Sequence, residues 1–131
     1  MPRFFAALGP LAGRLLLSGI FLYTGWHKFT ETGRTASTIA GRGIPFATTA
    51  AYAAGAFELA VAVLVALGVR VRSVALATIA YLAVITWFVH FRAAAHGDVA
   101  QTVQVLKNAA IAGGMMLLAS HGAGPASIDR G

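Results

Sequence analysis

Ionisable residues inside long apolar segments are the groups in this sequence with the clearest chemical potential. Glu58 lies within an apolar segment that runs from Ala47 to Leu67, and Lys107 lies within a later one. A charged side chain in hydrocarbon is costly unless it is paired, and it commonly marks a functional site. We therefore expect Glu58 to form an ion pair, to exchange protons beside a ligand, or to act as a neutral hydrogen-bond donor because burial keeps it protonated.

Several of these polar residues fall toward the same end of their segments. At a rise of 1.5 Å per residue, Glu58 and Lys107 lie roughly 12–16 Å from that end, which predicts an ion pair between them. Lys28, His90 and Asn108 belong to the same end of three segments. Together these five side chains predict a polar pocket between helices, with donors that could hold the headgroup of a ligand.

Arg14, in the first apolar segment, completes the set of candidate pocket residues. Each candidate also has a simpler interpretation. A pair between Glu58 and Lys107 could only fix the order of the helices, and Arg14 could extend its side chain to the nearby membrane surface. Lys28 and His90 could anchor helix ends at the interface. The residue types assign no catalytic role to any of them.

Metal and covalent chemistry find no support in the sequence. The absence of cysteine excludes disulfides, thiolate metal sites and dithiol redox chemistry. The four histidines do not share a predicted helix at a spacing of three or four residues, which a helical metal site would need. Hydrolase, kinase, P-loop and dinucleotide-binding patterns are also missing. We therefore expect no metal site and leave the catalytic residues unknown.

Membrane helices must position these side chains. The chain has 131 residues, of which 58% are hydrophobic and four are acidic, and a soluble domain of this size could not bury so much apolar surface. A membrane helix needs about 20 mostly apolar residues. Helices are predicted over residues 11–28, 47–67, 73–91 and 99–120. The predicted fold is all-α: an integral membrane four-helix bundle that forms a single membrane domain over residues 1–131.

The connections indicate how this bundle lies in the membrane. The longest one is expected to hold a short interfacial helix over residues 35–42, which Gly43 and Pro45 end. The basic residues behind the net charge of +6 stand singly, which favours contact with anionic lipid headgroups over nucleic acid. Four crossings place both termini on one side, and the short turn with Arg70 and Arg72 predicts that this side is cytoplasmic.

The order and spacing of these pieces resemble the DoxX family of small four-helix membrane proteins, over nearly the whole chain. The matching pieces are Arg14 with residues 21–29, 43–45, 54–59, 89–91 and 106–109. The resemblance implies a multi-pass protein of the bacterial plasma (inner) membrane. One branch of the family resembles the membrane subunit of thiosulfate:quinone oxidoreductase. The resemblance to the family extends to a set of polar residues, for which it implies no catalytic role: Arg14, Lys28, Glu58, His90, Lys107 and Asn108.

Three functions follow as hypotheses. The first is an accessory or quinone-interacting subunit of a redox system, a partner of a membrane oxidoreductase rather than a stand-alone enzyme, with a quinone in the pocket. The second is a non-catalytic scaffold that binds a partner subunit through its outer faces. The third is a small transporter or lipid-handling protein, which would need a homo-oligomer because four helices leave little room for alternating access. The expected contacts are the lipid bilayer and another membrane or membrane-associated protein or a second copy.

Overall fold

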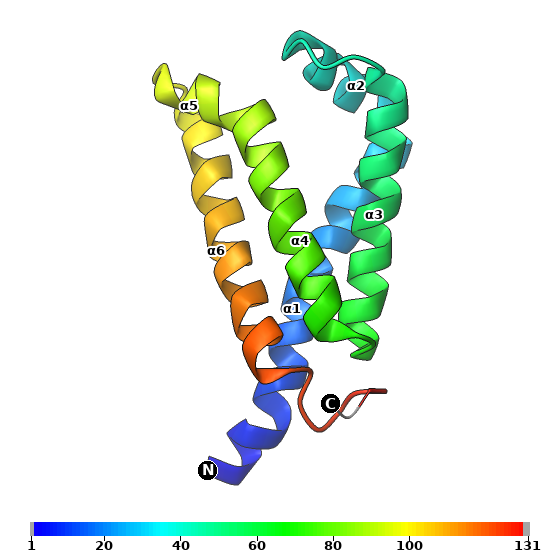
Figure 1. The fold of residues 1–131 in the computed structure, drawn as a ribbon, viewed down its shortest axis with the longest axis vertical. Helices are drawn as coiled ribbons and strands as arrows, with labels where there is room; N and C mark the ends of the chain where they lie inside the picture. The colour runs from blue at the N-terminus through cyan, green and yellow to red at the C-terminus, as the bar shows by residue number, and fades with distance from the viewer. Residues whose placement is uncertain (1, 130–131) are drawn as a thin grey trace.

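The computed structural model describes residues 2–129 as helices joined by short connections (Figure 1). In chain order they are α1 (Pro2–Thr30), α2 (Thr32–Gly41), α3 (Ala47–Leu67), α4 (Val71–Ile85), η1 (Thr86–Phe91), α5 (Arg92–Ala95) and α6 (Val99–His121). The described residues contain no strand, so the all-α prediction is confirmed. Both ends of the chain lie at one end of the molecule, and α2 and α5 lie at the other (Figure 1).

Three helical stretches are long and apolar enough to cross a membrane. They are α3, the continuous stretch Val71–Ala95 that joins α4, η1 and α5, and α6. These stretches indicate an integral membrane protein in contact with the lipid bilayer. Helix α1 is 29 residues long and carries Arg14 and Lys28 within it.

Three elements differ from their predicted bounds. The helix predicted over residues 73–91 begins at Val71 and continues through η1 and α5 to Ala95. Helix α1 begins at Pro2 rather than near residue 11 and continues through Pro10. Proline removes a single backbone donor, and membrane helices tolerate that loss. Helix α2 begins at Thr32 rather than at residue 35, and the chain leaves it through Gly43, whose φ of +76° suits a residue without a side chain.

A close crossing of α1 and α3 sets the position of the polar residues. Gly25 is buried against α3, and a Cβ atom there would lie 3.0 Å from the backbone nitrogen of Leu59. Gly55 is buried against α1, and a Cβ atom there would lie 2.9 Å from the ring of Phe29. Small residues permit this approach, as membrane helix interfaces commonly require. The crossing brings the last two turns of α1 onto the middle of α3.

The apolar core lies between the long helices. Its buried side chains come from α1, α3, α4, α6 and the C-terminal tail: Phe21, Val61, Ala62, Val65, Val71, Ala75, Leu82, Met115, Leu118 and Ala123. Many large apolar side chains point outward instead, as expected for helices that face lipid. The packing is most extensive between α1 and α3 and between α4 and α6, so the bundle consists of two helix pairs.

Candidate functional site

Glu58 is buried at 3% exposure and is held by side chains from two other helices. Lys28 Nζ on α1 lies 3.0 Å from one carboxylate oxygen and 3.1 Å from the other. One turn earlier on the same face, the Thr24 hydroxyl donates to Oε2 at 2.6 Å. The Tyr81 hydroxyl on α4 donates to Oε1 at 2.5 Å. The carboxylate is therefore fully engaged and links α3 to α1 and α4.

The ion partner of Glu58 is Lys28, and the predicted pair with Lys107 is wrong. No ion pair joins Lys107 to Glu58 in the described part of the chain. Equal depth of two residues along their helices predicts a contact between them only if the helices run parallel. The crossing at Gly25 and Gly55 instead places the end of α1 directly beside Glu58, so the nearer lysine satisfies the carboxylate.

A cavity of about 220 Å³ lies next to this ion pair, between α1, α3, the α4–η1 stretch and α6. Lys28, Glu58, His90, Lys107 and Asn108 all line it. The remaining lining residues are Ile20, Phe21, Thr24, Leu82, Ile85, Gln104 and Ile111. The five polar residues that the sequence assigned to one pocket thus lie around one cavity, although Glu58 has another partner than expected.

The π-helical segment η1 carries two of the groups near this cavity. His90 Nδ1 lies 2.6 Å from Gln101 Oε1 on α6, and because an amide oxygen only accepts, the imidazole donates through Nδ1. The Asn108 amide donates to the Thr86 hydroxyl at 3.0 Å. Single π-helical turns inside α-helices are frequent at functional sites. Both contacts fasten this turn to α6 beside the cavity.

Among the charged residues that line the cavity, Lys107 is the one without a partner in the described part of the chain. Its side chain is half-buried, and none of the described residues forms a hydrogen bond or ion pair with it. Lys28 and Glu58 line the same cavity. Two ammonium groups therefore face one carboxylate, and the cavity has an excess of positive charge. Such a site favours a group with electron-rich oxygen atoms.

Arg14 lies away from this cavity, contrary to its place among the predicted pocket residues. It is fully buried near the middle of α1, where Nη1 donates to the carbonyls of Val65 at 3.3 Å and Ala66 at 3.0 Å. Nη2 donates to the carbonyl of Ala126 in the tail. Fourteen residues separate Arg14 from Lys28, about 21 Å along a helix. The guanidinium instead caps the carboxyl end of α3, where partial negative charge accumulates.

The set of residues predicted from the sequence omitted several polar residues of this site. Thr24 follows from Lys28 by a spacing of four residues, which puts both on one helical face. Tyr81 could have been found as a phenol inside an apolar segment, since a buried hydroxyl needs a partner. Gln104 lies three residues before Lys107 on α6, and this spacing also places two side chains on one helical face.

Comparison with known proteins places the chain in a family. The sequence model of the DoxX family matches residues 9–91, from within α1 to the end of η1. Searches of curated proteins and of solved structures gave no significant match. Since the match covers more than half of the chain, this protein belongs to the DoxX family.

Proposed function

We propose that this chain is a membrane subunit that holds the headgroup of a quinone in the cavity between its two helix pairs, beside a redox partner protein. In this arrangement α1 is a fourth membrane crossing and α2 lies at the interface. The location of both chain ends at one end of the molecule supports an even number of crossings (Figure 1). The short turn with Arg70 and Arg72 favours the cytoplasm for that end.

The half-buried, unpartnered Lys107 carries this proposal. An ammonium group on a cavity wall within a membrane helix needs an acceptor, and a quinone carbonyl supplies one. Asn108 uses one amide hydrogen on Thr86 and keeps a second for the ligand. With the His90 Nδ1 hydrogen directed at Gln101, Nε2 is left as an acceptor for a quinol hydroxyl. A volume of about 220 Å³ suits a headgroup rather than its isoprenoid tail.

Calorimetric titration of the detergent-purified protein with ubiquinone-1 and with menadione tests this proposal. Lys107→Met is expected to weaken binding by roughly tenfold to a hundredfold, because one hydrogen bond to a charged group is worth about 1.5–3 kcal/mol. Arg34→Met, which removes one exposed charge from α2, is the matched control and should bind as the parent does. Absence of binding to the parent protein, or equal weakening by both variants, would contradict the proposal.

The Glu58 network supports a second candidate function, that of a scaffold. Glu58 receives donors from α1 and α4, and these contacts hold three helices together without any ligand. A scaffold predicts that Lys107→Met leaves association with a partner subunit unchanged, whereas changes at Glu58 weaken it by loosening the bundle. Co-purification of a membrane partner with each variant would distinguish the scaffold from the quinone site.

A further inference from the structure

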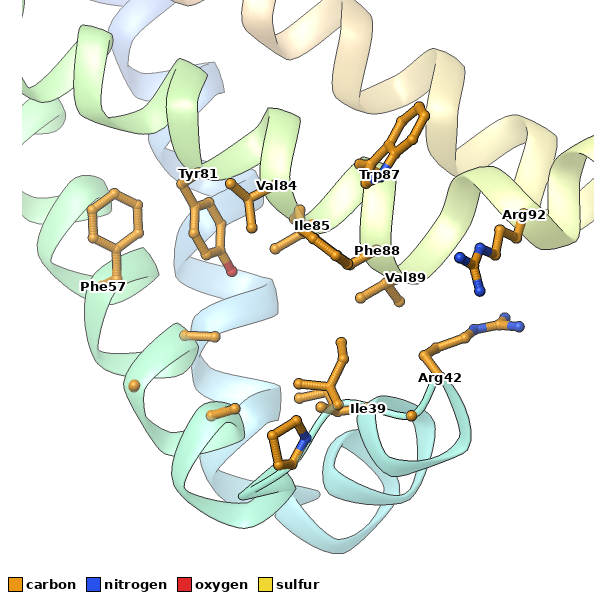
Figure 2. Close-up of a pocket in the computed structure, with 16 residues that line it drawn as sticks. Ile39, Arg42, Phe57, Tyr81, Val84, Ile85, Trp87, Phe88, Val89 and Arg92 are labelled. Atoms are coloured by element: carbon orange, nitrogen blue, oxygen red, sulfur yellow. The ribbon is translucent and has the colours of Figure 1, made fainter.

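A second and larger cavity lies on the other side of Tyr81. It is a groove of about 810 Å³ between α3 and the α4–η1 stretch, and the connection that follows α2 closes one of its ends (Figure 2). This volume is within the range of about 300–1,000 Å³ that is usual for ligand sites. Its walls are almost entirely apolar, and the large side chains that form them include Phe57, Val84, Trp87 and Phe88. A groove of this kind accommodates a hydrocarbon chain.

Two arginines stand at one rim of this groove. Arg42 follows α2 and Arg92 begins α5, and both guanidinium groups extend from the same edge of the groove (Figure 2). Both side chains are exposed, and neither forms an ion pair with the described residues. An anion between two guanidinium groups lowers the repulsion between them. Guanidinium groups bind phosphate oxygens with particular strength because they offer paired N–H donors.

The protein itself has no carboxylate to spare for these arginines. The chain contains four acidic residues, and each is engaged elsewhere: with Arg34, with Lys28, with the backbone N–H of Gln101, and with the backbone N–H of Arg70. The acidic residues concerned are Glu31, Glu58, Asp98 and Asp129. The negative charge that complements Arg42 and Arg92 must therefore come from another molecule.

We propose that the groove binds one anionic glycerophospholipid of the surrounding bilayer. Its phosphate lies between Arg42 and Arg92, and one of its acyl chains fills the apolar groove along α3 and η1. Lipid is the occupant favoured by the juxtaposition of a charged rim with a long apolar cavity at the end of the membrane helices. This site does not depend on the quinone proposal, because the hydrogen bond between Tyr81 and Glu58 lies between the two cavities.

Native mass spectrometry of the full chain provides the test. The protein is released from dodecyl maltoside micelles that contain equal amounts of phosphatidylglycerol and phosphatidylcholine with the same acyl chains. The parent is expected to retain phosphatidylglycerol in preference to phosphatidylcholine by on the order of tenfold, the effect of two arginines at one headgroup. The variant R42Q/R92Q should lose this preference. Each single variant should show an intermediate preference, which keeps the test valid if the double variant does not fold.

Three further variants separate this site from general surface charge, from other occupants and from the quinone cavity. The variant R70Q/R72Q removes the same number of charges at the opposite end and should keep the preference. Ala53→Phe narrows the groove at an exposed lining position and should lower retention of both lipids. Lys107→Met should leave the preference for phosphatidylglycerol unchanged.

Any of three results would overturn the proposal. The first is a parent protein without preference for phosphatidylglycerol. The second is an equal loss of preference in the two arginine double variants, which would show attraction to the surface as a whole. The third is a dimer mass that Ala53→Phe abolishes while lipid retention is unaffected, which would assign the groove to a second copy of the chain.

Discussion

The partner of Glu58 can be identified by a double-mutant cycle, because two lysines line the same cavity and the structure pairs only one of them with the carboxylate. We predict that Glu58→Gln is coupled to Lys28→Met and not to Lys107→Met. The amide of glutamine can still accept from Tyr81 and face the Thr24 hydroxyl, so most neutral hydrogen bonds survive. What the substitution removes is the negative charge beside Lys28 Nζ, which lies 3.0 Å from the carboxylate.

The burial of the two partners sets the magnitude. Breaking a fully buried ion pair costs about 3–5 kcal/mol, because it leaves one charge without compensation. The Glu58 side chain is 4% exposed, but that of Lys28 is 22% exposed and can reach a more polar region. We therefore expect Glu58→Gln to lower the free energy of unfolding by about 2 kcal/mol. Adding Lys28→Met should recover part of this loss, with a coupling energy of about 1–2 kcal/mol.

Reversible unfolding in mixed micelles of dodecyl maltoside and sodium dodecyl sulfate, followed by the loss of helical circular dichroism, measures these energies. The matched control is the cycle of Glu58→Gln with Lys107→Met, which removes the same charge from the other wall of the cavity. Its coupling energy should stay below about 0.5 kcal/mol, as for residues without a direct contact. A larger coupling to Lys107 than to Lys28 would refute the assignment of the ion pair and the crossing of α1 and α3 that produces it.

Two further predictions concern the ends of this helix pair. Arg14→Met should destabilise the protein by about 2 kcal/mol, because it removes charged hydrogen bonds to buried carbonyls. It should also speed hydrogen exchange at the amide of Ile128, which donates to the end of α3. Unchanged exchange at Ile128 would contradict the capping role of Arg14. Gly25→Val should cost about 1–3 kcal/mol through overpacking against the backbone nitrogen of Leu59. Gly19→Val, where nothing lies within 4 Å, is its control in the same unfolding assay.

Much of the architecture could be predicted because the apolar segments are bounded by clear breaks. Pro45 precedes α3, and Gly68, with a φ of +73°, follows it. Apolar content and length also identified the membrane-crossing stretches. The start of α1 could not be located in the same way. A proline can begin a helix or lie within one, and only the conformation of the preceding residues distinguishes these cases.

Part of the membership of the polar cavity was accessible from the sequence, whereas its pairing was not. Lys28, Glu58, His90, Lys107 and Asn108 could be grouped because each lies toward the same end of its segment. The choice of Lys28 as the ion partner depends on the angle at which α1 crosses α3. That angle follows from the packing of Gly25 and Gly55, and residue depth along a helix contains no information about it.

The cavity has a physical origin in the way the two helix pairs are fastened. Within the first pair, the contact of Lys28 with Glu58 holds α1 to α3, and within the second, the bond from Asn108 to Thr86 holds η1 to α6. The hydroxyl of Tyr81 joins the pairs at Glu58.

A uniform helical period cannot describe the side chains beyond Ile85, because a π-helical turn contains an additional residue and changes the helix faces on which later residues lie.

Most polar groups thus bond within their own helix pair, and the cavity lies where the two pairs meet. Lys107 lines the cavity from α6, where Lys28 is engaged with Glu58 and Asn108 with Thr86. If Lys107 replaced Lys28 as the ion partner of Glu58, Lys28 would be left without a partner. The net charge of the cavity would therefore stay the same. The unpartnered ammonium group is therefore a consequence of having two lysines for one buried carboxylate, and it is the physical basis of the proposal that the cavity binds a ligand with acceptor oxygens.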